Sequence, residues 1–256
     1  MRIAIDCRLA DSSGVGVYLR GCLPYFLESP HTFTLFGDPA VLHGLAPDAD
    51  ERKREIIPCA VRPFSLSELC AFPRRLRDAI NRADRYYSPY FNLPGGITAP
   101  VYTTIHDIIF PDMPELTSRA GLAARMWFYR RAFRRSRTVF TVSQFSKSRI
   151  AHFLGNAAPI VVTRSAVQPA LQGGAPKGVT KKETVLFIGN IKKHKGLPCL
   201  LDGFFRARAE GLAHRLVIVG EKDNFRSSDA GSLRDLAHTD PSAVEFTGRV
   251  PPESLK

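Results

Sequence analysis

The sequence predicts an α/β protein made of two domains, each built on a parallel sheet with flanking helices. Short apolar runs alternate along the chain with stretches of helical periodicity, which is the pattern of βαβ units. The chain has 256 residues, a length that exceeds the usual size of one domain. Of these residues 44% are apolar, enough for a packed core. A stretch rich in Gly, Pro and Lys interrupts the alternation, so we expect domains at residues 1–166 and 184–256 joined by a linker at 167–183.

The first domain is predicted from a series of strand-like runs separated by helices. Helices are expected at residues 16–28 and 143–155, where apolar residues recur every three or four positions. In the second of these helices, Ser143 can cap the start and Gly155 can end it. The predicted strands of this domain lie at residues 2–6, 33–36, 85–88, 101–106 and 138–143.

The second domain repeats the same alternation over fewer elements. Strands are expected at residues 184–189, 215–220 and 243–248, with a helix at 197–211. A doubly wound domain usually has five or six strands with helices on both faces, and three strands would leave apolar sheet surface uncovered. We therefore expect this second domain to be incomplete.

The net charge of the chain narrows the class of partner. Lys and Arg number 36 against 24 Asp and Glu, a formal charge of +12, which suits nucleic acid, an acidic membrane surface or a phosphorylated small molecule. Arginine clusters at residues 74–77 and 130–137 are predicted to be solvated helix faces, with contact to anionic lipid head groups or nucleic acid as the alternative. Because no zinc-finger spacing, aromatic RNP strand or helix-turn-helix is present, we expect no nucleic-acid partner.

The five cysteines are odd in number and widely spaced, without a Cys-x-x-Cys pair. They are expected to be reduced and mostly buried, as in a protein of the cytosol. No apolar run approaches the roughly 20 residues of a transmembrane helix, and the apolar start is interrupted by Asp6 and Arg8, unlike a signal peptide. The sequence therefore predicts a cytoplasmic protein.

A glycine-containing turn follows the first predicted strand, in the stretch DSSGVGVYLR. Gly14 and Gly16 lack side chains, so the backbone there can approach a phosphate and direct its N–H groups toward it. A dinucleotide-binding fingerprint would need a third glycine, but that position holds Leu19. The alternative is an ordinary glycine turn.

A histidine and an aspartate come just after the strand predicted at residues 101–106. His106 and Asp107 therefore fall where open α/β sheets place their sites, at the carboxyl end of a strand. An imidazole there can hydrogen-bond a substrate hydroxyl or phosphate, and a neighbouring carboxylate can orient it. The alternative is a histidine that caps a loop.

Positive charge is concentrated in the stretch FIGNIKKHKG, between a strand and a helix of the second domain. Lys192, Lys193 and Lys195 precede a helix N-terminus that itself favours anions, so this turn would attract a diphosphate. The alternative is a solvated basic turn.

Four stretches, taken in order, resemble glycosyltransferase family 4. They are MRIAIDCRLADSSGVGVYLR, YYSPYFNLPGGITAPVYTTIHDIIFPDMPE, TVFTVSQFSKSRIAHFLG and VLFIGNIKKHKGLPCLLDGFF. The resemblance implies the GT-B fold, with two Rossmann-like doubly wound domains that face each other across a cleft. In this family the first domain chiefly holds the acceptor and the second holds a nucleotide-sugar donor.

The resemblance also assigns roles to the candidate residues. It implies that His106 and Asp107 lie at the reaction centre, that Ser143 and Ser146 line the cleft or acceptor site, and that Lys195 neutralises the donor diphosphate. Asn190 stands where the family often has a second basic residue, and Lys192 could replace it. The glycine turn at Gly14 and Gly16 would lie near the same diphosphate.

The expected function is retaining transfer of a sugar, with mannose from GDP-mannose as first choice, to a glycan or lipid-linked acceptor in cell-surface polysaccharide or glycolipid assembly. No metal or cofactor is expected beyond the donor, and the protein would be cytoplasmic or peripheral at the inner face of the membrane. The family's paired glutamates, in an EGFGLP-like stretch, are not found before Lys256. We therefore expect a truncated chain with little or no activity, and the alternative is a non-catalytic binding protein associated with a membrane or a complex.

Overall fold

The structure of the chain is a computed structural model that describes residues 1–12, 14–45, 50, 52–166, 178, 182–189, 191, 193–220, 242–248 and 250. The chain divides into two compact units: unit 1, Met1–Pro169, and unit 2, Ala170–Lys256. Of the linker predicted at residues 167–183, only residues 178, 182 and 183 belong to the described part.

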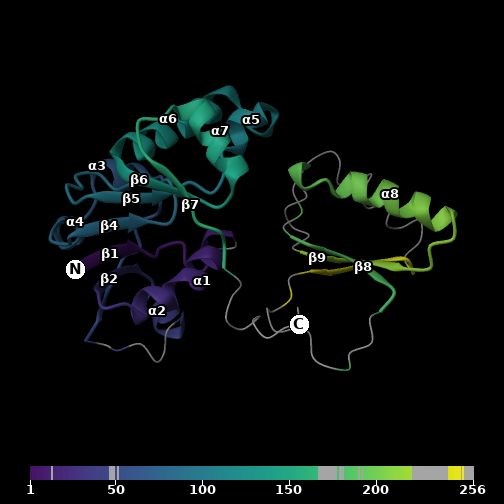
Figure 1. Cartoon of the computed structure of the whole chain (residues 1–256), viewed down its shortest axis with the longest axis horizontal. Helices are drawn as coiled ribbons and strands as arrows, with labels where there is room; N and C mark the ends of the chain where they lie inside the picture. The colour runs from purple at the N-terminus through teal and green to yellow at the C-terminus, as the bar shows by residue number, and fades with distance from the viewer. Residues whose placement is uncertain are drawn as a thin grey trace. The chain divides into compact units, whose positions relative to one another are not determined.

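Unit 1 contains a seven-stranded parallel sheet in the order β3-β2-β1-β4-β5-β6-β7 (Figure 1). All five strands predicted from the sequence are confirmed, and the two additional strands, β3 and β7, lie at the edges of the sheet. Edge strands are half solvated, so they lack the continuous apolar run that marks a central strand. The strands are β1 (Arg2–Asp6), β2 (Thr32–Gly37), β3 (Arg54–Pro58), β4 (Arg85–Ser88), β5 (Val101–Thr104), β6 (Ser136–Thr141) and β7 (Ile160–Val162).

Helices cover both faces of this sheet. On one face, Leu19 and Leu23 of α1 pack with Leu35 of β2. On the other, Phe133 of α6 packs in a second core with Val139 of β6, and α4 and α7 join it (Figure 1). The helices of unit 1 are α1 (Gly14–Glu28), α2 (Pro39–Leu45), α3 (Leu66–Cys70), α4 (Arg74–Asn81), α5 (Ile109–Asp112), α6 (Arg119–Arg135) and α7 (Gln144–Leu154), with a 3-10 turn η1 (Pro114–Leu116).

The predicted boundaries of α7 are confirmed by its caps. The Ser143 hydroxyl accepts a hydrogen bond from the Ser146 N–H at 3.0 Å, and Gly155 ends the helix with a φ of 80°. The arginine-rich segment 130–137 falls mostly in α6. Its Phe133 points inward and is 1% exposed, as expected of an amphipathic helix.

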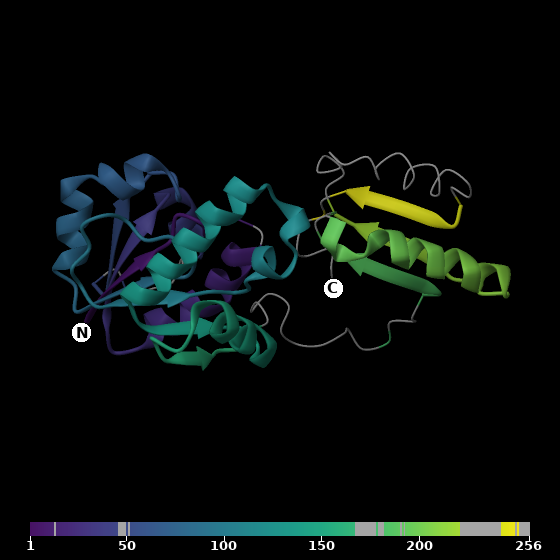
Figure 2. The ribbon, with the colours of Figure 1, turned by 90° about the horizontal axis from the view of Figure 1, so that it is seen from above.

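Unit 2 has a three-stranded parallel sheet in the order β10-β9-β8 within the described residues. Its strands β8 (Thr184–Ile188), β9 (Arg215–Val219) and β10 (Val244–Gly248) and its helix α8 (Leu197–Ala209) confirm the predicted elements. The helix lies along one face of the sheet, roughly parallel to the strands, and buries Leu201 and Phe204 (Figures 1 and 2). A 3-10 turn, η3 (Lys193–Lys195), precedes it.

All five cysteines are free, but the expectation that most are buried is wrong. Cys7 and Cys59 are buried, whereas Cys70 at the end of α3 and Cys199 in the first turn of α8 are exposed. Short helices and first turns present an outward face that the sequence pattern alone does not reveal. Within the part of the chain that the structure describes, no helix has the length and apolar character needed to cross a membrane.

Candidate active site

The carboxyl edge of the unit 1 sheet gathers the residues that the sequence predicts there. The strand order reverses between β1 and β4, and in open parallel sheets this switch point opens the crevice where ligands bind. The loops after β1, β4, β5 and β6 all leave the sheet at this edge. These loops and the first turns of the helices that follow them carry the predicted residues Gly14, Gly16, His106, Asp107, Ser143 and Ser146.

A buried ionic network lies beneath this edge. Arg8, just after β1, contacts Asp6 at 2.5 Å and Glu68 at 2.6 Å, and all three side chains are nearly inaccessible to solvent. The Asn92 amide donates to both carboxylates, at 3.1 and 2.9 Å, and Tyr86 donates to Asp6. Burial raises the pKa of Asp6, but the charge and hydrogen bonds of Arg8 outweigh it and hold that pKa below its usual value.

The network fixes the loops that border the crevice. Arg8 donates to the Val61 carbonyl at 2.9 Å, and Glu68 accepts from the Phe64 N–H at 2.6 Å. Phe64 has a φ of 63°, which is strained for a residue with a side chain, so this hydrogen bond helps to hold an unfavourable backbone in place. Through Asn92 the same carboxylates hold the loop after β4. This positioning role was not predicted from the sequence, because Glu68 lies 60 residues from Arg8.

His106 is half-buried and lies two residues after the end of β5, in the loop that leads to α5. Its Nε2 lies 2.9 Å from the Pro89 carbonyl oxygen, and because that oxygen can only accept, Nε2 carries the proton. Burial lowers the pKa of the imidazole, against the opposing effects of Pro89 and the charge of Asp107. The ring is therefore neutral at pH 7, and Nδ1 keeps a lone pair that can accept a hydrogen bond from a hydroxyl.

Two tyrosines pack around the imidazole. The ring of Tyr18, from α1, meets the His106 ring edge-on, with centroids 4.8 Å apart. The centroid of the Tyr90 ring lies 6.2 Å from that of His106. Asp107 is exposed, and its carboxylate accepts a hydrogen bond from the Ile109 N–H at 3.4 Å. In the described contacts the imidazole is thus oriented by Pro89 and Tyr18, and Asp107 acts on it only through its charge.

The two glycines of the turn after β1 have different surroundings. A Cβ atom on Gly16 would lie 2.5 Å from the Ala10 carbonyl oxygen and 2.9 Å from that of Leu9, so no side chain fits there. The Gly16 N–H is held by the Ser12 hydroxyl at 3.1 Å. A Cβ on Gly14 would meet nothing within 4 Å. Gly16 is therefore needed for packing within the turn, and Gly14 is the position with open space for a ligand.

Ser143 and Ser146 stand at the start of α7. The Ser143 hydroxyl donates to the Ser146 hydroxyl at 3.1 Å in addition to accepting from its N–H, and Ser146 is buried. Both hydroxyls thus serve the helix cap in this structure. Nearby, the Thr141 hydroxyl at the end of β6 is buried and has no hydrogen-bond partner within the described residues.

Unit 2 presents a carboxyl edge of its own, where each strand ends at a glycine. Gly189, Gly220 and Gly248 follow or close β8, β9 and β10, and a Cβ on Gly220 would lie 2.1 Å from the Gly189 carbonyl oxygen. A Cβ on Gly248 would meet nothing within 4 Å, whereas one on Gly189 would meet the Phe187 ring at 3.9 Å. Lys195 is exposed at the same edge, one residue before Gly196, whose φ is 68° at the start of α8. Asn190 and Lys192, predicted for the same site, lie outside the described residues.

The repeated strand-end glycine is a signal that the sequence already contained. The strand segments 184–189, 215–220 and 243–248 all end in Gly. Parallel strands bring their carboxyl ends to one edge, so this repetition predicts an edge where a ligand can approach the backbone.

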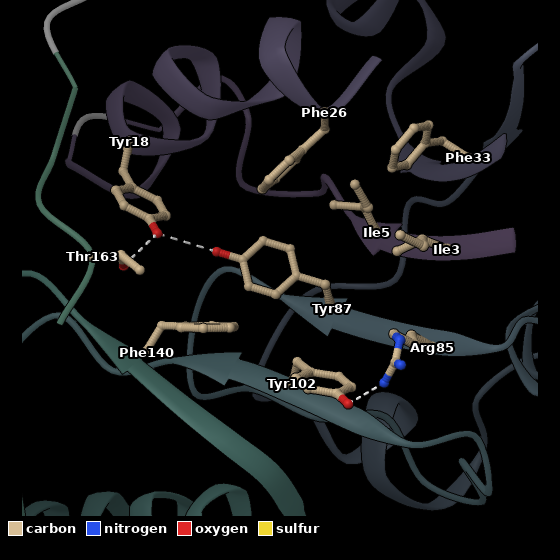
Figure 3. A pocket seen from close by; sticks show the side chains of 10 residues that line it. All are labelled: Ile3, Ile5, Tyr18, Phe26, Phe33, Arg85, Tyr87, Tyr102, Phe140 and Thr163. Carbon is tan, nitrogen blue, oxygen red and sulfur yellow. Dashed lines mark hydrogen bonds between the residues drawn. The ribbon is translucent and has the colours of Figure 1, made fainter. Parts of the chain in front are cut away.

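An apolar cavity of about 500 Å³ lies on the α1 face of the unit 1 sheet (Figure 3). Tyr18 closes one end, where its hydroxyl lies 3.3 Å from the Thr163 hydroxyl and 3.5 Å from that of Tyr87. Arg85 stands at the other end, bonded to the Tyr102 hydroxyl. Tyr18 therefore belongs to both this cavity and the surroundings of His106. The cavity is lined by Ile3, Ile5, Tyr18, Phe26, Phe33, Arg85, Tyr87, Tyr102, Phe140 and Thr163.

Comparison with solved structures reveals several similar folds. The crystal structure of Anabaena Alr3699/HepE in complex with UDP and glucose matches with a TM-score of 0.66 and 18% identity, over 98% of this chain and 70% of that chain. A glycosyltransferase from Rickettsia africae matches with a TM-score of 0.60 and 12% identity, over 97% and 68% of the two chains. At these identities the likeness shows the shared GT-B fold. Comparison with curated protein sequences found no match.

A protein-family model matches most of the sequence of unit 1. The sequence profile of Glycosyltransferase Family 4 matches residues 12–171, which is more than half of the chain. The matched segment includes the glycine turn, the network residue Glu68, His106 and the α7 cap. The chain therefore belongs to glycosyltransferase family 4.

Proposed function

We propose that this protein transfers a sugar from a nucleotide-sugar donor to a glycan or lipid-linked acceptor, with retention of configuration at the transferred carbon. The observation that carries the proposal is the family match over residues 12–171, which spans the loops at the carboxyl edge of the unit 1 sheet. That edge carries the neutral imidazole of His106, whose Nδ1 can accept a hydrogen bond from a hydroxyl. Such a site suits hydroxyl-bearing ligands.

Unit 2 supplies features that suit the donor diphosphate. Gly248 at the end of β10 has open space where a side chain would lie, and the exposed Lys195 adds a positive charge at the start of α8. The N-terminus of an α-helix carries a partial positive charge of its own. When the bond between sugar and diphosphate breaks, the diphosphate gains negative charge, and a fixed cation such as Lys195 would stabilise it without a proton transfer.

In unit 1, His106 is suited to position a hydroxyl rather than to act as a strong base. Its pKa is lowered by burial, so the ring is a weak base, and its free Nδ1 can accept a hydrogen bond from a sugar or acceptor hydroxyl. We infer that the attacking hydroxyl gives its proton to an oxygen of the departing phosphate. Attack on the same face as the departing group would then account for retention.

The donor proposed first is GDP-mannose, on the resemblance of the HD and HKG stretches to mannosyltransferase-type members of the family. UDP-glucose is the second donor to test, because UDP and glucose are bound in the crystal structure of the Anabaena protein. The acceptor would be a glycan or lipid-linked sugar used in cell-surface polysaccharide or glycolipid assembly. No metal or cofactor enters the proposed chemistry.

The test is to follow donor consumption by proton NMR with GDP-mannose and UDP-glucose, and to identify the anomer of the sugar first released. Consumption by the wild-type protein that falls at least about 100-fold in His106→Ala, with the donor's configuration retained, supports the proposal. Binding of a nucleotide without consumption would instead favour a non-catalytic binding protein. Neither binding nor consumption of any nucleotide sugar would refute the proposed function.

A further inference from the structure

One face of α6 forms a hollow rich in arginine around a half-exposed tryptophan. The hollow measures about 660 Å³, and Trp127, which lines it, is 50% exposed. Counted from Trp127, the arginines lie three, four, seven and eight positions further along the helix, and Ala123 lies four positions before it, so they share one face. This arginine hollow is lined by Ala123, Trp127, Arg130, Arg131, Arg134 and Arg135.

The positive charge of the arginine hollow is not balanced by acidic side chains. No carboxylate is among its lining residues. Arg131 donates to the Leu93 carbonyl at 2.6 Å and to the Pro94 carbonyl at 3.1 Å, and Arg135 is bonded to the Ile97 carbonyl, so neutral groups hold these two guanidiniums in place. Burial lowers the pKa of Arg131, and the neighbouring charge of Arg135 lowers it further.

The other two arginines are available to a ligand. Arg130 and Arg134 are exposed, and within the part of the chain that the structure describes neither makes a hydrogen bond or ion pair. They lie four positions apart, one turn from each other, beside the indole. A second pair of exposed arginines, Arg74 and Arg75, lies on α4, where Arg74 is 3.5 Å from the Asp78 carboxylate. The α4 pair therefore provides a matched comparison.

We propose that the arginine hollow of α6 docks on an anionic phospholipid surface, with Arg130 and Arg134 at lipid phosphates and Trp127 at the level of the head groups. Guanidinium groups match phosphate oxygens in geometry and charge. A half-exposed indole with a polar N–H is the side chain that best suits the boundary between head groups and acyl chains. This inference does not depend on the proposed sugar transfer.

The lipid surface is favoured over nucleic acid by the composition of the hollow. Proteins that bind single strands use several aromatic rings in a row along a basic groove, whereas this hollow contains one aromatic ring. A duplex backbone would contact the arginines but would give the exposed indole no apolar environment. The guanidinium carbon of Arg131 lies 5.8 Å from the centroid of the Trp127 ring, and the Phe128 ring meets that ring edge-on with centroids 5.0 Å apart. These contacts hold the indole in a fixed position on the surface.

Trp127 makes the proposal directly measurable, because it is the one tryptophan of the chain. The experiment titrates the protein with vesicles of phosphatidylcholine alone or mixed with phosphatidylglycerol, and records tryptophan emission and co-sedimentation. We expect a blue shift and sedimentation with the mixed vesicles only. The double variant Arg130→Gln, Arg134→Gln should bind them about 30-fold more weakly, since each basic residue near an anionic surface contributes about 1 kcal/mol. Arg74→Gln, Arg75→Gln carries the same charge change and should bind like the wild type.

Four results would overturn the proposal. Equal weakening in both double variants would show a general charge effect, and equal binding to neutral vesicles would show that phosphate recognition is absent. A blue shift with single-stranded oligonucleotide but not with vesicles would identify a nucleic-acid surface. The same shift with inorganic phosphate alone would identify a small-anion site. Circular dichroism melting of both double variants checks that the folded state is retained, which is expected for exposed side chains.

Discussion

The ring of Tyr18 meets the imidazole of His106 edge-on, with ring centroids 4.8 Å apart. This contact joins the first helix of unit 1 to the loop after β5, across the carboxyl edge of the sheet. It also covers part of the imidazole, whose pKa is lowered by burial. The protonation state of the central candidate residue therefore depends on a residue 88 positions away in the sequence.

Replacing Tyr18 should change the titration of His106. In Tyr18→Ala the imidazole gains solvent, so its pKa should rise toward the ordinary value of 6.5. Tyr18→Phe keeps the ring and should leave the pKa unchanged. The measurement is an NMR titration of the histidine ring signals, and an unchanged His106 pKa in the alanine variant would show that Tyr18 does not desolvate the imidazole.

The buried histidine also makes folding sensitive to mild acid. Its folded-state pKa lies below 6.5, so as the pH falls below that value the unfolded chain binds a proton more readily than the folded protein does. Stability is therefore lost as the pH falls. In His106→Gln, whose amide can donate to Pro89 in place of Nε2, this loss should be absent. Chemical denaturation of both proteins at several pH values measures it, and parallel pH profiles would contradict the expectation.

Substitution by alanine should have different effects on stability at Gly14 and at Gly16, the two glycines at the start of α1. Gly16→Ala places a Cβ against the carbonyl oxygens of Ala10 and Leu9 and should cost about 1–3 kcal/mol of unfolding free energy. Gly14→Ala meets open space at the start of α1 and should be neutral or stabilising by up to about 1 kcal/mol. Denaturation followed by Trp127 emission reports on unit 1 directly. Equal losses in the two variants would contradict the assignment.

Removing the cation of the buried network should be far more damaging than removing an exposed one. Arg8→Met leaves Asp6 and Glu68 buried without a counter-charge and should cost about 3–5 kcal/mol. Arg74→Met breaks an exposed pair with Asp78 and should cost less than about 0.5 kcal/mol. The deficit of Arg8→Met should shrink in acid as the carboxylates become protonated. A similar loss of unfolding free energy in the two variants would mean that the buried network does not stabilise unit 1.

The sequence predicts the sheet framework well because the central strands are apolar runs bounded by polar turns. It misses two edge strands, β3 and β7. The segment of β3 contains the charged residues Arg54 and Glu55, and β7 is only three residues long. His106 could be placed from the rule that parallel strands present their ligands at the carboxyl end. Glu68 could not, because its role depends on a contact with Arg8 that spans 60 residues. The packing need at Gly16 likewise depends on the path of the Leu9–Ala10 backbone.

The central claim is that unit 2 holds a nucleotide diphosphate at the edge where the strand-end glycines and Lys195 lie. The most direct test is calorimetric titration of the protein with GDP, UDP, GDP-mannose and UDP-glucose, beside Lys195→Ala and the exposed lysine control Lys182→Ala. We predict binding of a nucleotide by the wild type and by Lys182→Ala, with GDP favoured, and at least about tenfold weaker binding by Lys195→Ala. Binding that is unchanged in Lys195→Ala, or absent with every nucleotide, would contradict the account.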